Sequence, residues 1–309
     1  MGRKKMRAGL ACFALAAAIL IAAVCAAESW DQIFVENEWN YADSAMDISG
    51  GIPDNATGVM DRIRRNGVLR VATEPFFAPF EFVDPDLKGQ EQYAGADMML
   101  ARLIAERMGV ELEIIPMEFT QVMPALNENQ CDLTISAIAF TPGRASTYAL
   151  SKGYYFPDNG ASVVFIIREE DQEKINSVEA LEDKVIIAQS NSLQEAMASE
   201  HVYSYKEFHR AASAQAVYEA VKSGQADAGV VDLESAETYI KNNPNAGLTI
   251  AGGMNYKLEE HFMGYRVAAK KGELQLIYFV NGVINEATEY ATYDTWVEQA
   301  EKRAEELGM

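Results

Sequence analysis

Short apolar runs alternate with helix-type patterns along the chain from about residue 68 onward. Runs rich in β-branched residues predict strands at 68–72, 112–115, 132–136, 162–167, 185–188, 226–231, 248–251 and 262–269. Apolar residues at three- and four-residue spacing predict helices at 96–108, 120–129, 192–199, 214–222, 234–241 and twice more from residue 273 to the end. Strands that alternate with helices pair in parallel under a helical cover. We therefore expect an α/β protein of two lobes, each a mostly parallel sheet flanked by helices.

The first 27 residues have the pattern of an export signal. Four basic side chains within the first seven residues precede an apolar run that ends at Ala27, and small residues suit cleavage near 26–28. Two alternatives stay open: a lipoprotein signal with Cys25 as the acylated residue, and a retained signal anchor. We expect an exported protein, in the periplasm or at the outer face of the cytoplasmic membrane. Residues 28–59 form an extension with two tryptophans among acids, which could dock on the body of the protein or on a partner.

Charge and cysteine content limit the possible partners of the protein and the ways in which its fold is stabilised. The net charge is −20, and loss of the first 27 residues removes four positive charges and no negative ones, which gives −24. This charge disfavours nucleic acid and anionic membranes as partners. Cys131 is then the one remaining cysteine, so a packed core rather than disulfides must stabilise the fold. The sequence offers no metal-ligand spacing, phosphate loop or nucleophile–base pair, and we expect no metal, cofactor or catalytic residue.

Several candidate binding residues follow directly on predicted strands. After the strand at 132–136, Thr141 is placed to cap a helix, and Arg144 projects from the first turn beside free backbone N–H groups. Such a guanidinium is a receptor for a carboxylate, although a surface arginine at an ordinary helix start fits the same pattern. Glu74, Ser192 and Asp232 also follow strand runs. Because ligands in α/β sheets bind beyond the carboxyl ends of strands, we expect one site built from both lobes.

An ordered series of short segments carries a family resemblance. The segments are Gly-Val-Leu-Arg-Val-Ala-Thr-Glu-Pro at 67–75, Pro-Phe-Glu-Phe at 79–82, Pro-Ala-Leu at 124–126, Thr-Pro-Gly-Arg at 141–144, Gly-Tyr-Tyr at 153–155, Gln-Ser-Asn-Ser-Leu-Gln-Glu at 189–195, Gly-Gln-Ala-Asp-Ala at 224–228 and Lys-Gly at 271–272. In order and spacing, from about residue 60 to the C-terminus, the chain resembles the extracytoplasmic amino-acid-binding proteins of ABC importers. These form solute-binding protein family 3, with the type II periplasmic-binding-protein fold.

The resemblance implies two lobes joined by two hinge strands, near 156–163 and 263–267, that close on the ligand. The first lobe would be 60–158 plus 267–309, and the second 159–266. It implies a monomeric, non-enzymatic receptor that delivers an amino acid to the membrane permease of an ABC transporter. Two alternatives stay open: an exported enzyme like the cyclohexadienyl dehydratases, with Glu74 as acid or base, and a ligand-sensing partner of a membrane receptor.

The resemblance also assigns roles to the charged and aromatic candidates. Arg144 stands where the family clamps the ligand α-carboxylate, Asp232 where its acid receives the α-ammonium, and Ser192 where a hydroxyl touches the carboxylate. Phe77 and Phe119 match the aromatic positions that enclose the ligand side chain. A bound zwitterion needs one fixed cation and one fixed anion, because either charge buried alone costs several kcal/mol. The residues alone also allow helix caps at Asp232 and Ser192, and a core role for Phe119.

The remaining candidates bear on specificity. Ser136 and Ala137 would offer backbone groups beside the arginine. Glu74 matches a position where an acid can pair with a cationic side chain, which suggests a basic or polar amino acid. Two positions depart from the family: Ala139 stands where Ser or Thr is usual, and Asn191 replaces the usual glycine. Both departures leave room for a modified ligand.

Overall fold

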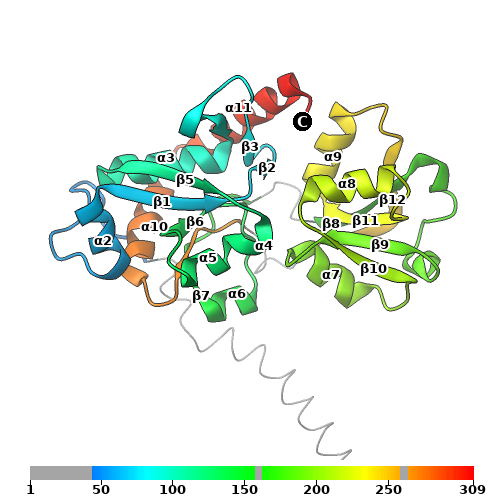
Figure 1. Ribbon diagram of the computed structural model, residues 1–309, viewed down its shortest axis with the longest axis horizontal. Helices are drawn as coiled ribbons and strands as arrows, with labels where there is room; N and C mark the ends of the chain where they lie inside the picture. Colours follow the sequence, from blue (N-terminus) through cyan, green and yellow to red (C-terminus); the bar gives the residue numbers. More distant parts are fainter. Residues whose placement is uncertain (1–43, 157–161, 258–263) are drawn as a thin grey trace, which may run out of the picture. The chain divides into compact units, whose positions relative to one another are not determined.

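Two five-stranded sheets organise the part of the chain that the computed structural model describes, residues 44–156, 162–257 and 264–309 (Figure 1). The first sheet has the order β5-β1-β6-β13-β7. Its strands are β1 (Val68–Thr73), β5 (Glu111–Pro116), β6 (Leu133–Thr134), β7 (Tyr148–Leu150) and β13 (Ala268–Lys270). Strands β5, β1 and β6 are parallel, whereas β13 runs antiparallel to both β6 and β7.

The second sheet comes from one continuous stretch and has the order β10-β9-β11-β8-β12. Its strands are β8 (Ser162–Arg168), β9 (Val185–Gln189), β10 (Glu207–Ala211), β11 (Ala228–Asp232) and β12 (Leu248–Lys257). Strands β10, β9 and β11 are parallel, and β8 lies antiparallel between β11 and β12. We call each sheet with its covering helices a lobe.

A small antiparallel sheet extends the first lobe beyond the end of β1. It consists of β2 (Phe76–Phe77), β3 (Glu81–Val83) and β4 (Tyr93–Ala94). The sequence pattern did not predict these strands, because two or three residues are too few to show an alternation. They bring the aromatic segment after β1 next to the pocket described below.

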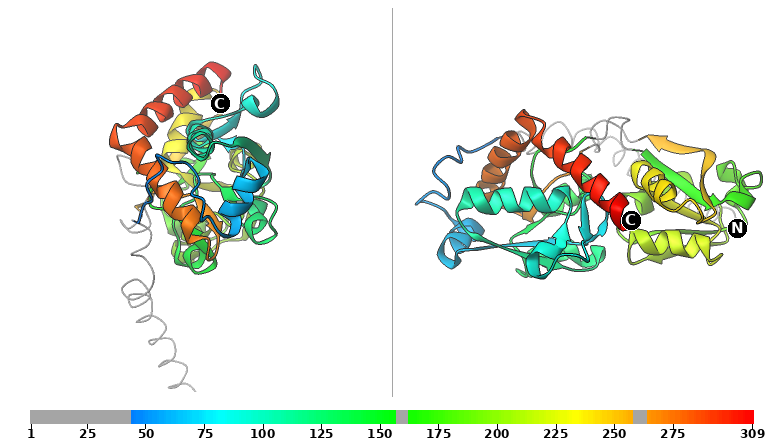
Figure 2. Two further views of the ribbon diagram at one scale, coloured as in Figure 1. Left: turned by 90° about the vertical axis from the view of Figure 1, so that its left-hand side faces the viewer. Right: turned by 90° about the horizontal axis from the view of Figure 1, so that it is seen from above.

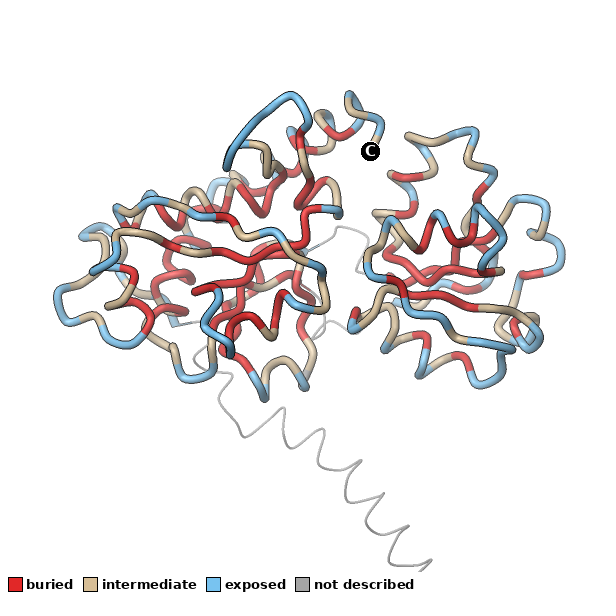
Figure 3. The backbone as a smooth tube through the Cα atoms, viewed as in Figure 1, coloured by how far each residue is buried: buried red, intermediate tan, exposed pale blue. Residues whose placement is uncertain are grey.

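Helices cover both sheets. They are α2 (Gly58–Asn66), α3 (Ala96–Met108), α4 (Phe119–Val122), α5 (Pro124–Asn127), α6 (Pro142–Thr147), α7 (Leu193–His201), α8 (Ala214–Lys222), α9 (Leu233–Asn242), α10 (Leu274–Glu289) and α11 (Thr292–Leu307), with short 3₁₀ turns at Gly89–Gln92, Glu169–Asp171 and Val178–Leu181. In the second lobe, Val163 and Phe165 of β8 pack with α7, and Val164 packs with α8 and α9. Neighbouring residues of β8 thus enter different cores, and the central strands β8 and β11 are buried along nearly their whole length (Figure 3).

The predicted fold class is confirmed, with both sheets mixed. The helix at Ala96–Met108 has the expected bounds, and Gly109 ends it in the left-handed conformation at φ 70°. Two expectations are wrong. The helix expected at 120–129 is split into α4 and α5, because Pro124 has no N–H to continue the first helix. The strand expected at 262–269 is confined to β13 among the described residues, and 258–263 lie outside them.

The start of the described chain lies along α10, as the blue segment beside the orange helix in Figure 2. The backbone N–H of Met46 donates to the carbonyl of Tyr278 at 2.8 Å, and Asn281 Nδ2 donates to the carbonyl of Ser44 at 2.8 Å. A Cβ atom at Gly282 would lie 2.5 Å from the Met46 carbonyl oxygen, so this close contact requires glycine. Residues 44–57 of the expected extension therefore dock on the body of the protein.

Other predictions fall outside the described residues. The expected export signal at 1–27, which includes Cys25, and residues 28–43 of the extension are not among the described residues. Parts of both expected hinge crossings are not described either. The proposed lobe boundaries therefore stay a prediction. In 44–156, 162–257 and 264–309, no helix combines the length and the apolar character needed to cross a membrane.

Candidate functional site

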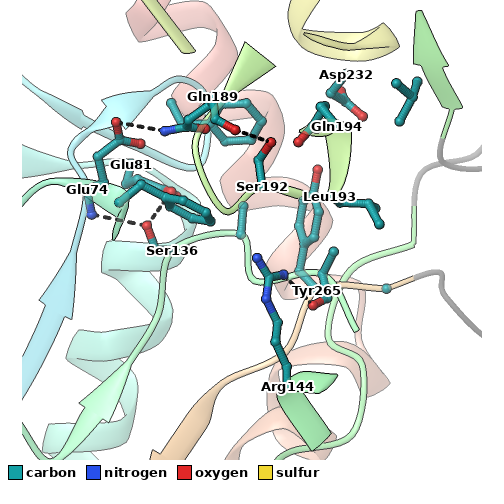
Figure 4. Close-up of a pocket in the computed structure, with 16 residues that line it drawn as sticks. Glu74, Glu81, Ser136, Arg144, Gln189, Ser192, Leu193, Gln194, Asp232 and Tyr265 are labelled. Carbon is teal, nitrogen blue, oxygen red and sulfur yellow. Dashed lines mark hydrogen bonds between the residues drawn. The ribbon is translucent and has the colours of Figure 1, made fainter. Parts of the chain in front are cut away.

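A pocket between the two lobes receives residues from both of them. It holds about 670 Å³ of space, part of it open to solvent. Nine of the ten residues expected from the sequence line it: Glu74, Phe77, Phe119, Ser136, Ala137, Ala139, Arg144, Ser192 and Asp232. Three charged side chains, Glu74, Arg144 and Asp232, approach it from three different sides (Figure 4).

Arg144 has the local geometry expected from its sequence. The hydroxyl of Thr141 caps α6 by accepting from the Arg144 backbone N–H at 3.1 Å. The Arg144 Nη1 donates to the carbonyl of Ala139 at 2.7 Å, and Nη2 donates to the carbonyl of Asn191 in the second lobe at 3.2 Å. The guanidinium carbon lies 5.8 Å from the centroid of the Phe119 ring. Burial lowers the pKa of Arg144 to about 10, because these neutral partners do not balance its charge.

Asp232 combines two roles that the sequence left open. It ends β11 and caps α9, where its Oδ1 accepts from the Ser235 backbone N–H at 3.1 Å. The residue also lines the pocket and is buried. Burial raises the pKa of Asp232 to about 6, although hydrogen bonds from backbone N–H groups oppose the shift. The carboxylate thus has a helix end on one side and the pocket on the other.

Ser192 also caps a helix and lines the pocket. Its Oγ accepts from the Glu195 backbone N–H at 3.0 Å and donates to the carbonyl of Gln189 at 2.7 Å. The hydroxyl proton is therefore already committed within the second lobe. A ligand carboxylate would have to replace the Gln189 carbonyl to receive it.

Glu74 is a buried acid at the end of β1, with 2% of its surface exposed. Its backbone N–H donates to Ser136 Oγ at 3.1 Å, and its Oε1 accepts from Gln189 Nε2 at 3.1 Å, across the gap between the lobes. Burial raises the pKa of Glu74 to about 8, more than the Gln189 hydrogen bond lowers it, and the charge of Glu118 adds to the rise. A neighbouring cation would reverse this shift.

A second buried acid, Glu81, lies next to this position and was not predicted. Its Oε1 accepts from Ser136 Oγ at 2.9 Å, and it lines the pocket. Burial and the nearby charge of Asp97 raise the pKa of Glu81 well above its usual range, and burial raises the pKa of Asp97 as well. Two buried carboxyl groups so close together disfavour each other's charged form.

Asp97 fixes the backbone of the loop that follows β6. Its Oδ2 accepts from the Ala137 N–H at 2.7 Å, and its carboxylate also accepts from the hydroxyls of Tyr154 and Tyr293 at 2.6–2.9 Å. Ala137 has a φ of 43°, which is unfavourable for a residue with a Cβ atom. The expected strand at 132–136 ends early, at Thr134, and the chain then turns toward the pocket.

Asn191 is the one predicted site residue whose side chain does not line the pocket. It adopts φ 60°, which explains why this turn suits glycine or asparagine. Its N–H donates to Glu195 Oε2 at 2.7 Å, and its carbonyl receives Arg144. The backbone of Asn191, rather than its side chain, reaches the site.

The pocket contains other residues that the sequence reasoning missed, among them Glu81, Gln189, Gln194 and Tyr265. Two of them carried a signal. Glu81 is a charged residue between two aromatics, Phe80 and Phe82, and Gln189 directly follows the strand predicted at 185–188, as the predicted site residues follow theirs. In the described ranges, no group of three His, Cys, Asp or Glu side chains is arranged to hold a metal ion.

The chain is similar to several known amino-acid-binding proteins. The chain is 30% identical to the arginine-binding extracellular protein ArtP of Bacillus subtilis over 177 residues. The aligned region covers 57% of this chain and 65% of that protein. An amino acid ABC transporter substrate-binding protein of Streptococcus pneumoniae bound to L-arginine is 32% identical, with a TM-score of 0.70 over 79% of this chain and 98% of the other. An ancestral arginine-binding protein bound to glutamine is 30% identical, with a TM-score of 0.65 over 75% and 97%.

The family model of the bacterial extracellular solute-binding proteins, family 3, matches residues 69–300. The match spans both sheets and every residue of the pocket described above. The resemblance inferred from the sequence is thereby confirmed, and this chain belongs to the bacterial extracellular solute-binding proteins, family 3.

Proposed function

We propose that this protein captures a cationic L-amino acid, first of all L-arginine, between its lobes and delivers it to the permease of an ABC importer. One observation carries the proposal: a guanidinium and two acids from different elements, Arg144, Asp232 and Glu74, line one pocket without a charged partner in the described parts of the chain. One positive and two negative groups match a zwitterion with a cationic side chain.

Each charged group has a role in this proposal. Arg144 binds the α-carboxylate, Asp232 binds the α-ammonium, and Glu74 pairs with the cationic end of the side chain. Phe77 and Phe119 enclose its apolar stem. A micromolar dissociation constant corresponds to about 8 kcal/mol, and charge-assisted hydrogen bonds of about 1.5–3 kcal/mol each, with aromatic burial, account for it.

The similarity to proteins named or crystallised as arginine binders supports a basic ligand. The ancestral protein bound to glutamine makes glutamine the most informative neutral competitor. Ala139 offers no hydroxyl to the carboxylate, so we expect the Arg144 guanidinium to carry most of that contact. The relatives named above are binding proteins, and we propose no catalytic step.

Binding of purified mature chain to common amino acids by thermal shift, followed by calorimetry, tests the proposal. We expect L-arginine to bind most tightly and agmatine, which lacks the α-carboxylate, to bind at least about a hundredfold more weakly because Arg144 loses its partner. If arginine, lysine and histidine are all silent while another amino acid binds, the ligand is not basic. If no amino acid binds, the protein is not an amino-acid receptor.

We also propose that the first 27 residues direct export and are then removed. The alternative is a lipid anchor on Cys25. The mass of the protein recovered from its native envelope separates the two outcomes, because acylation retains Cys25 and adds the mass of its lipid, whereas cleavage near 26–28 removes the cysteine.

A further inference from the structure

A small cavity, which we call the neck, shares lining residues both with the candidate pocket and with a second, larger compartment. The neck shares Phe77, Gln189 and Asp232 with the pocket. It shares Phe77, Ala214 and Tyr218 with the outer compartment. The three spaces are thus neighbours with common walls, and Asp232, the acid proposed to receive the ligand nitrogen, lines both the pocket and the neck.

The outer compartment is larger than the pocket and has aromatic walls. It holds about 1010 Å³ of space, part of it open to solvent, between the small sheet of the first lobe and helices α8 and α9 of the second. Phe76 and Phe82 line one side, and Tyr218 and Tyr239 line the other, with their rings stacked at 4.0 Å between centroids. Glu219 and Lys222 also line this space and are exposed, with Lys222 Nζ 3.7 Å from Glu219 Oε1. The aromatic walls favour an apolar group, and a ligand cation at Glu219 would compete with Lys222.

Tyr218 is an unusual wall residue. It is 4% exposed, and its hydroxyl has no hydrogen-bond partner among the residues that the structure describes. Buried hydroxyls are normally paired. Burial raises the pKa of Tyr218 well above its usual range, so the group stays protonated and remains a donor. An acceptor oxygen in the neck would satisfy it.

We propose that the protein also binds amino acids that carry an acyl group on the α-nitrogen, in the first place dipeptides with a basic C-terminal residue. The inference rests on the proposed function, because it keeps the C-terminal residue in the pocket with its carboxylate at Arg144. The peptide N–H then donates to Asp232, and the peptide carbonyl accepts from Tyr218. The N-terminal residue occupies the aromatic compartment, where Glu219 meets its ammonium.

Calorimetry with L-arginine, L-alanyl-L-arginine and L-arginyl-L-alanine tests this inference. We expect wild-type protein to bind alanyl-arginine within about tenfold of arginine, and arginyl-alanine at least about a hundredfold more weakly, because its basic residue would no longer occupy the pocket. Ala214→Phe fills the neck and should weaken alanyl-arginine at least about tenfold, with arginine changed less than about twofold.

Two further variants control for folding and for the role of the hydroxyl. Ala212→Phe makes the same exchange of side chains at an exposed position that lines none of the three spaces, and should leave both affinities unchanged. Tyr218→Phe keeps the ring and removes the unpaired hydroxyl, so it should weaken alanyl-arginine alone, by about threefold to tenfold.

The outcomes separate this inference from the proposed function. If wild-type protein binds arginine but not alanyl-arginine, the inference is rejected and the proposed function stands. The inference is equally rejected if Ala214→Phe leaves alanyl-arginine unaffected or weakens both ligands alike. If neither ligand binds to wild-type protein, the proposed arginine site is rejected as well.

Discussion

The carboxylate of Glu74 accepts a 3.1 Å hydrogen bond from the side-chain amide of Gln189, which joins the end of β1 in one lobe to the end of β9 in the other. Arg144 makes the corresponding contact with the carbonyl of Asn191, at 3.2 Å. Both charged groups therefore have a neutral partner across the gap. A ligand that offers opposite charges replaces these bonds with stronger, charge-assisted ones, which is how it would favour the closed arrangement.

Replacement of Arg144 tests the carboxylate site. We expect Arg144→Ala to weaken amino-acid binding by at least about tenfold to a hundredfold, because a charge-assisted pair of hydrogen bonds is lost. Arg144→Lys keeps the charge without the planar fork, so its affinity should lie between those of the wild-type protein and the alanine variant. Calorimetric titration measures all three proteins, and an unchanged dissociation constant for the alanine variant would remove Arg144 from the site.

The raised pKa values of Glu74, about 8, and Asp232, about 6, predict a pH-dependent lobe closure. Both exceed the ordinary values of 4.5 and 3.8, so burial favours the protonated acids. Their contribution to the closed arrangement is present at low pH and is lost as the pH rises through about 6 and then about 8. Ligand-free protein should therefore be more open at pH 8.5 than at pH 5.

Small-angle scattering measures this opening as a larger radius of gyration at the higher pH. Arginine should reduce that radius at pH 8.5, because its charges compensate both acids. Glu74→Gln should weaken the pH dependence above about pH 6, where Glu74 and Glu234, whose pKa burial raises to about 7, both contribute. A radius that stays constant or falls as the pH rises would contradict the explanation.

Asp97 should stabilise the fold more than an ordinary buried polar residue. Asp97→Ala leaves the hydroxyls of Tyr154 and Tyr293 and the N–H of Ala137 without their acceptor. We expect the free energy of unfolding to fall by about 3–5 kcal/mol, measured in urea. Tyr293→Phe removes a single bond and should cost about 1 kcal/mol. Equal losses in the two variants would argue against Asp97 as the shared acceptor.

The backbone at Asn191 gives a prediction of opposite sign for two small substitutions. At φ 60°, Asn191→Gly should leave the melting temperature unchanged or raise it, whereas Asn191→Ala should cost about 1 kcal/mol because of its Cβ atom. Both variants keep the carbonyl that meets Arg144. Thermal unfolding compares them directly, and a glycine variant less stable than the alanine variant would show that side-chain contacts of Asn191 dominate.

The sequence was most informative where a local pattern determines local structure. The period of apolar residues and Gly109 defined α3, and the position of candidates after strand ends brought Glu74, Arg144 and Asp232 to one pocket. Prediction from the sequence failed where contacts between residues far apart in the chain determine the structure. The pairing of Glu81 with Asp97 depends on how β3 and α3 meet, and a charged residue in a strand ordinarily indicates an exposed face.

Strand β13 sets an order of events during synthesis. It pairs with both β6 and β7, yet it follows the whole second sheet in the chain. A ribosome or translocation channel therefore releases every strand of the second sheet before the first sheet can be completed. The second sheet can form first, whereas β6 and β7 have unpaired edges until residues 268–270 are available.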